Sequence, residues 1–287
     1  MKHAKCSGVT ALLLGGMFVL QPYVSSAAED TALPYYLRDR GEGIHTSLLG
    51  TYITRKEFLF YPFYEYTKFS NFEYKPDELG YTGDQDYFGQ ATEQEFLVYF
   101  AYGISHSLMI EFESALYSTV DFTKASDDTS NVPNTIDESG LGDTEFQVRW
   151  RWMTETERRP EGTFFFKTVF PLQQNEALLG TQDWEFSPGM LLTKGFRFGT
   201  LTLSLSLSYT TEDYNLEFGE YSLEYVKKTS DRWRFVAAFE GQQDEQQIIG
   251  EAQYHFAKHA TLKLNLGIGI TEKAPDYAPE IGVLFSF

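Results

Sequence analysis

Charged side chains recur at every second position in several apolar segments, and this spacing limits the chemistry they can perform. Glu111 and Glu113 alternate with isoleucine and phenylalanine, and Arg149 and Arg151 alternate with valine and tryptophan. A period of two places all the charges of a segment on one face of a β-strand. Because opposite charges on adjacent strands attract each other, the pattern predicts ion pairs on a polar surface that could attract or exclude charged solutes.

The histidines and the nucleophile motifs give little support for catalysis. Beyond residue 28 the histidines are His45, His106, His255 and His259, and only His255 falls within an alternating segment. A histidine beside Glu251 on such a segment is typical of an ion-pair member rather than a general base. The sequence has no Gly-x-Ser-x-Gly elbow and no metal-binding histidine motif. We therefore expect no enzyme activity, no metal site and no cofactor.

Residues 1–28 have the three parts of a secretory signal peptide. A basic start with Lys2 and Lys5 is followed by an apolar run over 9–20 and by small residues over 25–28. The apolar run is too short to cross a bilayer as a helix, which needs about 20 residues. We expect cleavage at the end of this segment. Since the one cysteine precedes the apolar run, the mature chain would hold no disulfide.

Net charge and aromatic content exclude two classes of protein. The chain has a net charge of −18, and removal of a signal peptide with two lysines and no acids lowers it to −20. Such a chain repels nucleic acid, so we expect no nucleic-acid partner. Aromatic residues make up 17% of the chain, far more than a disordered acidic chain would hold. A soluble acidic all-β protein remains compatible with composition alone.

Alternation of apolar and polar residues marks strands, and no segment after residue 28 is continuously apolar over the length of a spanning helix. A membrane protein of this sequence would therefore cross with strands closed into a barrel. The expected strands are 57–69, 93–104, 107–118, 141–153, 163–171, 183–194, 197–210, 217–229, 232–241, 247–256, 260–271 and 277–287. They predict an all-β, transmembrane, antiparallel, up-and-down β-barrel of 12 strands over 57–287, an even number as in bacterial single-chain barrels.

Loop lengths and strand ends favour the membrane barrel over a soluble sandwich, whose strands would also alternate. Tyrosine and tryptophan lie near strand ends. The connections expected on the periplasmic side are short, except 154–161, and the long connections 71–92 and 119–139 are expected outside. We therefore expect a monomer in the bacterial outer membrane, in contact with lipid and lipopolysaccharide.

Two features interrupt the regular pattern, and a third ends it. Residues 29–56 include the strand-like stretch 43–54, which we interpret as a periplasmic lead-in, a partial pairing with the barrel edge or a plug-like segment in the lumen. Pro62 removes one ladder hydrogen bond from the first strand, which predicts a bulge or a weakened seam. The alternating C-terminus, with Phe285 and Phe287, resembles the signal that the outer-membrane barrel assembly machinery reads.

The polar faces of the strands line the lumen if the apolar faces meet lipid. The expected pore-lining residues, in which carboxylates predominate, are Glu65, Glu95, Glu111, Glu113, Glu145, Gln147, Arg149, Arg151, Lys167, Glu185, Glu224, Arg234, Glu240, Glu251, Gln253, His255, Lys263, Asn265 and Glu280. Two interpretations of their charges remain open. They form either a selectivity lining that attracts cations or an ion-paired plug that fills and stabilises a narrow barrel.

Several segments resemble an outer-membrane family named for the MetA pathway of phenol degradation. They are 139–143 (SGLGD), 164–171 ending in Val-Phe-Pro, the hairpin segments 101–104 and 109–113, and 273–276. The similarity extends over most of 93–287, although the family's Pro-Thr-Gly is replaced by Pro-Leu-Gln at 171–173. The resemblance implies a 12-stranded, transporter-like barrel for small aromatic or hydrophobic molecules, and it supplies no catalytic residues.

The pattern and the resemblance together favour a channel or facilitator for small molecules, either cation-preferring or for small aromatic or hydrophobic solutes. A hydrophobic solute would use a lateral opening in the wall, for which the seam near Pro62 is a candidate. The alternative is a structural or surface-interaction barrel whose lumen is plugged by ion pairs. A minor alternative is an outer-membrane lipid hydrolase. Conductance separates the first two, and lipid turnover tests the third.

Overall fold

Strands form nearly all of the regular structure, as the alternating sequence predicts. The computed structural model describes residues 33–172, 176–211 and 214–287; the predicted signal peptide and residues 29–32 lie outside them. The strands are β1 (Ile44–His45), β2 (Tyr52–Ile53), β3 (Phe58–Tyr74), β4 (Tyr87–Gly103), β5 (Leu108–Thr123), β6 (Thr135–Gly140), β7 (Thr144–Met153), β8 (Glu161–Val169), β9 (Glu185–Gly195), β10 (Thr200–Thr210), β11 (Leu216–Lys228), β12 (Trp233–Gln242), β13 (Glu245–Ala257), β14 (Ala260–Gly269) and β15 (Ala278–Ser286).

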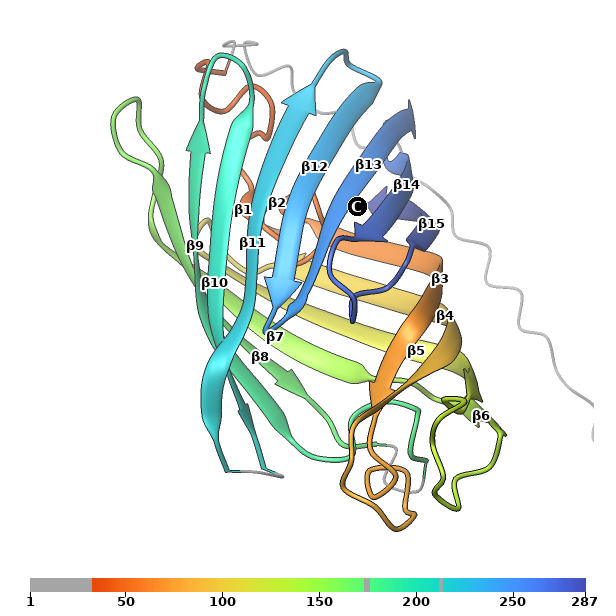
Figure 1. Cartoon of the computed structure of the whole chain (residues 1–287). Helices are drawn as coiled ribbons and strands as arrows, with labels where there is room; N and C mark the ends of the chain where they lie inside the picture. The colour runs from red at the N-terminus through yellow and green to blue at the C-terminus, as the bar shows by residue number, and fades with distance from the viewer. Residues whose placement is uncertain (1–32, 173–175, 212–213) are drawn as a thin grey trace, which may run out of the picture. The chain divides into compact units, whose positions relative to one another are not determined.

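Strands β3 to β15 form one antiparallel sheet that closes on itself (Figure 1). Closure joins β15 to β3, where the amide of Phe58 donates to the carbonyl of Phe287 at 3.0 Å and the amide of Phe287 donates back at 2.9 Å. β6 and β7 pair with successive parts of β5, so they are two halves of one barrel strand. The predicted transmembrane barrel of 12 strands is therefore confirmed.

The connections differ in length between the two ends of the barrel. At one end, here called the short-turn end, they are 104–107, 154–160, 196–199, 229–232 and 258–259. The other end, the long-loop end, carries 75–86, 124–134 and 170–184 among its connections. The C-terminal Phe287 lies at the short-turn end beside Phe58, as the expected topology requires.

The strand expected over 141–153 is wrong at its first residues, because the chain breaks the ladder between β6 and β7. There the amide of Gly142 donates to the carbonyl of Ala115 at 2.9 Å, and the amide of Ala115 donates to the carbonyl of Asp143 at 2.9 Å. A Cβ atom at Gly142 would lie 2.7 Å from the Ala115 Cβ and 2.9 Å from Glu95 Oε1. Glycine at this position therefore allows the close approach that divides the strand.

The connections expected over 71–92 and 119–139 are shorter in the structure, because three strands extend beyond their expected ends. β3 continues to Tyr74, β4 begins at Tyr87 and β5 continues to Thr123. These extensions are held by a separate apolar cluster at the long-loop end, whose buried members are Tyr74, Leu79, Tyr87, Phe122, Ala125 and Val132. Its buried residues come from the ends of β3, β4 and β5 and from two connections, so no single segment shows the alternation that would have predicted it.

Asp128 anchors the connection 124–134 to this cluster. Its carboxylate accepts a hydrogen bond from the hydroxyl of Tyr74 at 2.8 Å and one from the amide of Ser130 at 2.6 Å, and it lies 3.7 Å from the ammonium of Lys124. Burial by itself would raise the pKa of Asp128, but the hydrogen bonds from Ser130 and Tyr74 and the charge of Lys124 lower it below its usual value.

We predict that the connection 124–134 loosens in strong acid. Because the folded pKa of Asp128 is lowered, its stabilising contribution is complete above the unfolded value of about 3.9 and is lost as the pH falls through the lower folded value. Pepsin cleavage within 124–134 should therefore accelerate below about pH 4. Asp128→Asn should remove most of this pH dependence. Replacement of the exposed neighbour, Asp127→Asn, should retain it. Equal dependence of the cleavage rate on pH in the two variants would contradict the prediction.

The outer face of the barrel is an apolar belt. Exposed side chains on it include Phe112, Trp150, Phe164, Leu205 and Ile268, which alternate along their strands with buried or half-buried residues. Among the described residues, no helix has the length and apolar character needed to cross a membrane. Since large apolar side chains gain by leaving water, this face is suited to hydrocarbon and the polar residues turn inward.

Pro62 does not form a bulge, so that part of the expectation is wrong. It pairs in register with Val98 of β4, and the register shift in β3 lies between Phe69 and Phe72. On the other side of β3, the ladder to β15 stops after the pair of Gly282 with Phe63. It resumes at the pair of Phe285 with Phe60. Within this described seam the pairs opposite Pro62 are missing, as expected for a residue without an amide hydrogen.

Candidate functional site in the barrel lumen

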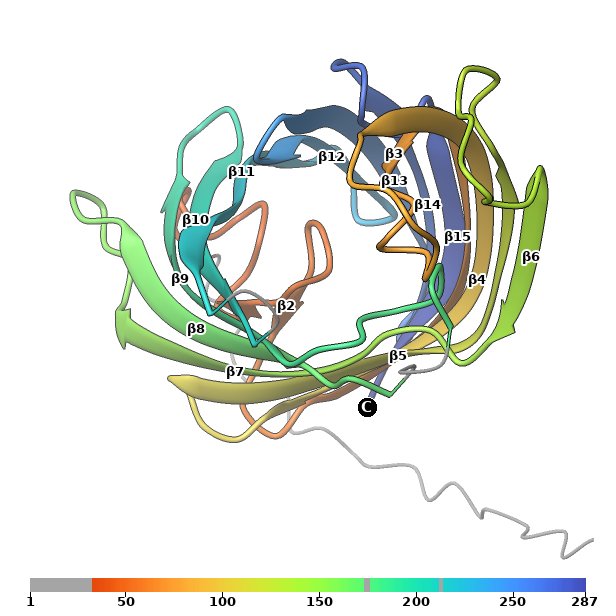
Figure 2. The ribbon, with the colours of Figure 1, turned by 60° about the horizontal axis from the view of Figure 1, so that its bottom comes forward.

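A short hairpin from the segment before the barrel lies inside the ring of strands (Figure 2). Its two strands pair Ile44 with Ile53 and His45 with Tyr52. The connection between them turns at residues 48–51, where the amide of Thr51 donates to the carbonyl of Leu48 at 3.1 Å. We call residues 43–53 the lumen hairpin.

Side chains of the barrel wall hold the turn of the lumen hairpin. Its backbone groups lack sheet partners there and need other hydrogen-bond partners. The carbonyl of Leu49 accepts from Gln253 Nε2 and from Lys263 Nζ, each at 3.1 Å. The amide of Gly50 donates to Glu224 at 2.8 Å, and its carbonyl accepts from Arg234 at 3.0 Å. The polar wall residues therefore recognise the hairpin backbone.

The opposite wall holds the hairpin in the same way. Arg149 donates to Glu111 at 3.1 Å and to the carbonyl of His45 at 3.1 Å. The second oxygen of Glu111 accepts from the amide of Ser47 at 2.8 Å and from the hydroxyl of Tyr99 at 2.7 Å. Of the two β5 carboxylates predicted to pair with Arg149, Glu111 does so, and this ion pair also positions the hairpin.

A buried ion-pair cluster fastens the base of the hairpin at the short-turn end. The guanidinium of Arg40 lies 3.0 Å from Glu155 and 2.9 Å from Glu161, and these side chains are only 1–2% exposed. Arg151 lies 3.1 Å from Glu161, and Lys194 lies 3.1 Å from Glu155. Burial by itself would lower the pKa of Arg40, but the charges of Glu161 and Glu155 raise it, so the guanidinium stays charged.

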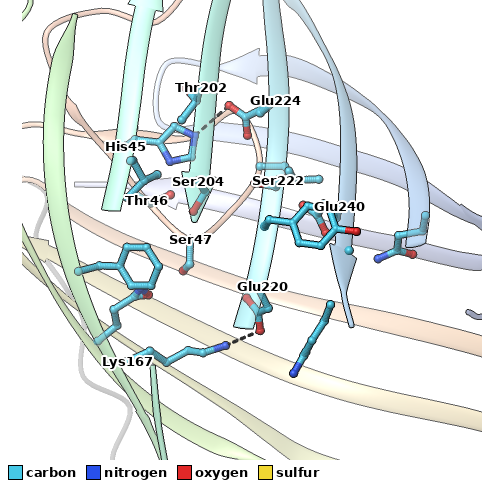
Figure 3. A pocket seen from close by; sticks show the side chains of 18 of the residues that line it. His45, Thr46, Ser47, Lys167, Thr202, Ser204, Glu220, Ser222, Glu224 and Glu240 are labelled. Atoms are coloured by element: carbon cyan, nitrogen blue, oxygen red, sulfur yellow. Dashed lines mark hydrogen bonds and ion pairs between the residues drawn. The ribbon is translucent and has the colours of Figure 1, made fainter. Parts of the chain in front are cut away.

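Between the hairpin and the long-loop end lies a cavity of about 570 Å³. Its lining includes His45, Thr46 and Ser47 of the hairpin and hydroxyl residues such as Thr202 and Ser204 (Figure 3). The aromatic Phe165 and Tyr221 also belong to the lining. The hairpin thus contributes to the wall of a chamber inside the barrel.

The cavity is strongly acidic. Its seven lining carboxylates are Glu65, Glu113, Glu145, Glu220, Glu224, Glu240 and Glu245, against the cations Arg149 and Lys167 and the histidine His45. Three of the carboxylates have basic partners. Glu224 lies 2.9 Å from His45, and Glu220 lies 2.9 Å from Lys167 (Figure 3). Glu145 lies 3.7 Å from Lys167. When these carboxylates are ionised, their excess negative charge would raise the local concentration of cations.

The structure divides the predicted pore-lining residues into groups. Eight of them line the cavity: Glu65, Glu113, Glu145, Gln147, Arg149, Lys167, Glu224 and Glu240. Others contact the segment before the barrel or its partners: Glu111, Arg151, Arg234, Glu251, Gln253 and Lys263. The remaining ones have partners elsewhere on the wall or begin a strand: Glu95, Glu185, His255, Asn265 and Glu280.

Sequence reasoning missed two kinds of functional residue. Glu220 and Glu245 line the cavity but were not among the predicted lining; Glu220 precedes Glu224 by four positions, so strand alternation places both on one face. The pairing of Arg40 with Glu155 and Glu161 left no sequence signal, because partners more than a hundred residues apart meet only when the barrel closes. Within the described residues, no group of His, Cys, Asp and Glu side chains is arranged to hold a metal ion.

The fold and the lumen define the class of protein as a transmembrane β-barrel of the outer-membrane type. No family model matches the chain, and no curated protein matches it in sequence. Its fold is similar to that of the COG4313 outer membrane channel from Pseudomonas putida F1, with a TM-score of 0.61 and 12% identity over 82% of this chain and 97% of that chain.

Two further solved barrels are less similar. The KdgM porin in complex with disordered oligogalacturonate gives a TM-score of 0.47 and 8% identity over 79% of this chain and 99% of that chain. The toluene transporter TodX of P. putida gives 0.40 and 8% identity over 88% of this chain and 98% of that chain. At these identities the similarity concerns the fold.

Proposed function

We propose that this protein is a cation-preferring channel or facilitator for small molecules in the bacterial outer membrane. The observation that carries the proposal is the lumen cavity, whose seven carboxylates face only Arg149 and Lys167 as permanent cations. In this proposal the short-turn end faces the periplasm, the long-loop end faces outward, and the predicted signal peptide directs export.

The lumen hairpin limits the size of the solute. It fills part of the barrel, so the space next to it is a chamber of about 570 Å³ rather than a wide aqueous pore. A small organic cation or a hydrated metal ion would find acidic partners in the chamber, and anions would be repelled. We propose no catalytic role for the lumen side chains, and the absence of lipid turnover by the purified protein would support this.

The test is the reversal potential of single channels in a planar bilayer under a salt gradient. At a pH high enough to ionise the lumen carboxylates, the wild-type protein should pass cations in preference to anions. Glu65, Glu113 and Glu240 line the cavity without a salt-bridge partner among the described residues, and their joint replacement by glutamine should lower the cation-to-anion permeability ratio. A unit charge about 6 Å from an ion contributes about 0.7 kcal/mol in water, so we expect at least about a threefold decrease.

A matched control removes three acids from the long-loop end: Asp84→Asn, Asp86→Asn and Asp127→Asn. These side chains lie outside the cavity lining, so the ratio should change little. An anion-selective wild-type current would overturn the proposed function. No current in any variant would favour the alternative of a structural barrel whose lumen is closed by its own ion pairs.

A second candidate function is the passage of small hydrophobic or aromatic solutes through the wall, as the family resemblance implies. The observation that favours it is the missing part of the β15–β3 ladder opposite Pro62. A disulfide across this seam would block such passage and leave ion conductance through the lumen unchanged. Uptake of a radiolabelled aromatic solute by proteoliposomes, with the cross-link formed and reduced, measures the difference.

A further inference from the structure

A second pocket, of about 460 Å³, lies at the short-turn end between the turns 229–232 and 258–259. Its lining is basic: Lys228, Arg232, Arg234, Lys258 and His255, together with Phe256. In a chain with a net charge of −18 this concentration of cations is unusual. We call it the rim pocket.

The cations of the rim pocket are only partly neutralised. The one carboxylate in the lining belongs to Asp231, which lies 3.1 Å from Lys228 and is itself fully exposed. Arg234 donates through Nη1 to the carbonyl of Gly50, while its buried Nε has no hydrogen-bond partner among the described residues. A buried guanidinium donor without a partner is expensive to retain unless an anion satisfies it.

The two turns that form the pocket are fixed relative to each other. The amide of His255 donates to the carbonyl of Arg232 at 2.8 Å, which continues the pairing of β12 with β13. The imidazole of His255 is within 2.7 Å of the hydroxyl of Thr261 on β14. The cations therefore project from a rigid strand framework, which limits the entropy lost when a ligand is bound.

Aromatic residues place the rim pocket at the height of the membrane surface. Phe256, in the lining itself, is 53% exposed. Trp233, which adjoins the turn 229–232, stacks on Phe235 and contacts Tyr254 on the outer face. Tryptophan and tyrosine on the outer face of a barrel mark the level of the lipid headgroups. A headgroup at this level has both a basic pocket for its phosphate and an apolar edge for its acyl chains.

We propose that the rim pocket binds the phosphate group of an anionic phospholipid in the leaflet at the short-turn end. Arg232 and Lys258 would face the phosphate from the two turns, and Arg234 lines the same pocket. Charge-assisted hydrogen bonds from arginine and lysine suit phosphate oxygens. The bound lipid would tie both turns to the membrane. This site is separate from the acidic cavity, and its test does not depend on conductance.

Native mass spectrometry of the purified, folded protein tests the proposal. With phosphatidylglycerol the wild-type protein should retain one lipid at concentrations where it retains no neutral phosphatidylcholine. The double variant Arg232→Gln, Lys258→Gln should bind phosphatidylglycerol about 30-fold more weakly, as expected from the loss of two cations near an anionic surface. Both substitutions lie in exposed turns, and retained heat-modifiable migration on gels verifies folding.

The matched control is Arg158→Gln, Arg159→Gln, which removes the same charge from another turn at the same end of the barrel. It should bind phosphatidylglycerol like the wild type. If both double variants bound phosphatidylglycerol equally weakly, the effect would come from the total positive charge at this end of the barrel. That result would overturn the proposed site. Displacement of the lipid by millimolar inorganic phosphate, or retention of phosphatidylcholine to the same extent, would overturn the lipid assignment.

Discussion

Replacement of Gly50 by alanine is expected to open the lumen. Gly50 lies in the turn of the lumen hairpin with φ +57°, and an added Cβ would overlap the Val236 γ2 methyl and lie 2.9 Å from Gln253 Nε2. A positive φ and overpacking together cost about 2–4 kcal/mol. The ratio of displaced to docked hairpin should then rise roughly 30- to 1,000-fold. Single-channel recordings should show longer and larger openings than in the wild type.

Gly41→Ala is the matched control for this experiment. Gly41 also has a positive φ, of +81°, but a Cβ atom there would meet nothing within 4 Å. It therefore imposes the backbone strain without the collision inside the barrel. Gly41→Ala should leave conductance close to that of the wild type. Equal openings in the two variants, or no larger openings in Gly50→Ala despite normal folding, would contradict a hairpin that narrows the lumen.

Arg40→Met is expected to lower the stability of the folded barrel by about 3 kcal/mol, near the lower limit for removal of one partner from a buried ion pair. The substitution leaves Glu155 and Glu161 buried without their shared guanidinium. Because Lys194 still lies 3.1 Å from Glu155 and Arg151 still lies 3.1 Å from Glu161, we do not expect a loss of stability above this lower limit. Urea unfolding of the protein in lipid vesicles, with equal m-values for both proteins, measures the difference.

The control for this change is Arg38→Met. Arg38 is exposed and donates one hydrogen bond, at 3.0 Å, to the carbonyl of Arg197. Exposed substitutions of this kind stay within about 0.5 kcal/mol of the wild type. If Arg40→Met were no more destabilising than Arg38→Met, the cluster around Arg40 would not be what fastens the hairpin.

The fold could be predicted from the sequence because alternation is a local property. In 201–209, leucine alternates with hydroxyl residues, and the structure forms β10 there with Leu203 and Leu205 exposed on the outer face. Strand ends were less predictable. The extension of β3 to Tyr74 depends on an apolar cluster gathered from three strand ends and two connections, and the break at Gly142 depends on the approach of Ala115.

The candidate site was predictable only in part. Alternation along the strands indicates which residues turn away from lipid. Glu113, Glu240 and Lys167 were predicted in this way, and the structure places them in the cavity lining. The residues before the barrel were compatible with three different roles. Their contacts depend on backbone groups, such as the carbonyls of Leu49 and Gly50, and backbone groups carry no mark in the sequence.

The sequence by itself determined the barrel class, the number of barrel strands and the face of each strand that bears charge, because each follows from a period of two along single segments. Only the tertiary structure decided that the lumen holds a hairpin and that its charges gather into an acidic chamber and a separate basic pocket. Arg40 meets Glu161, and His45 meets Glu224, only after the sheet closes around the segment. The pairing energy of these charges depends on distance and burial, and closure of the barrel sets both.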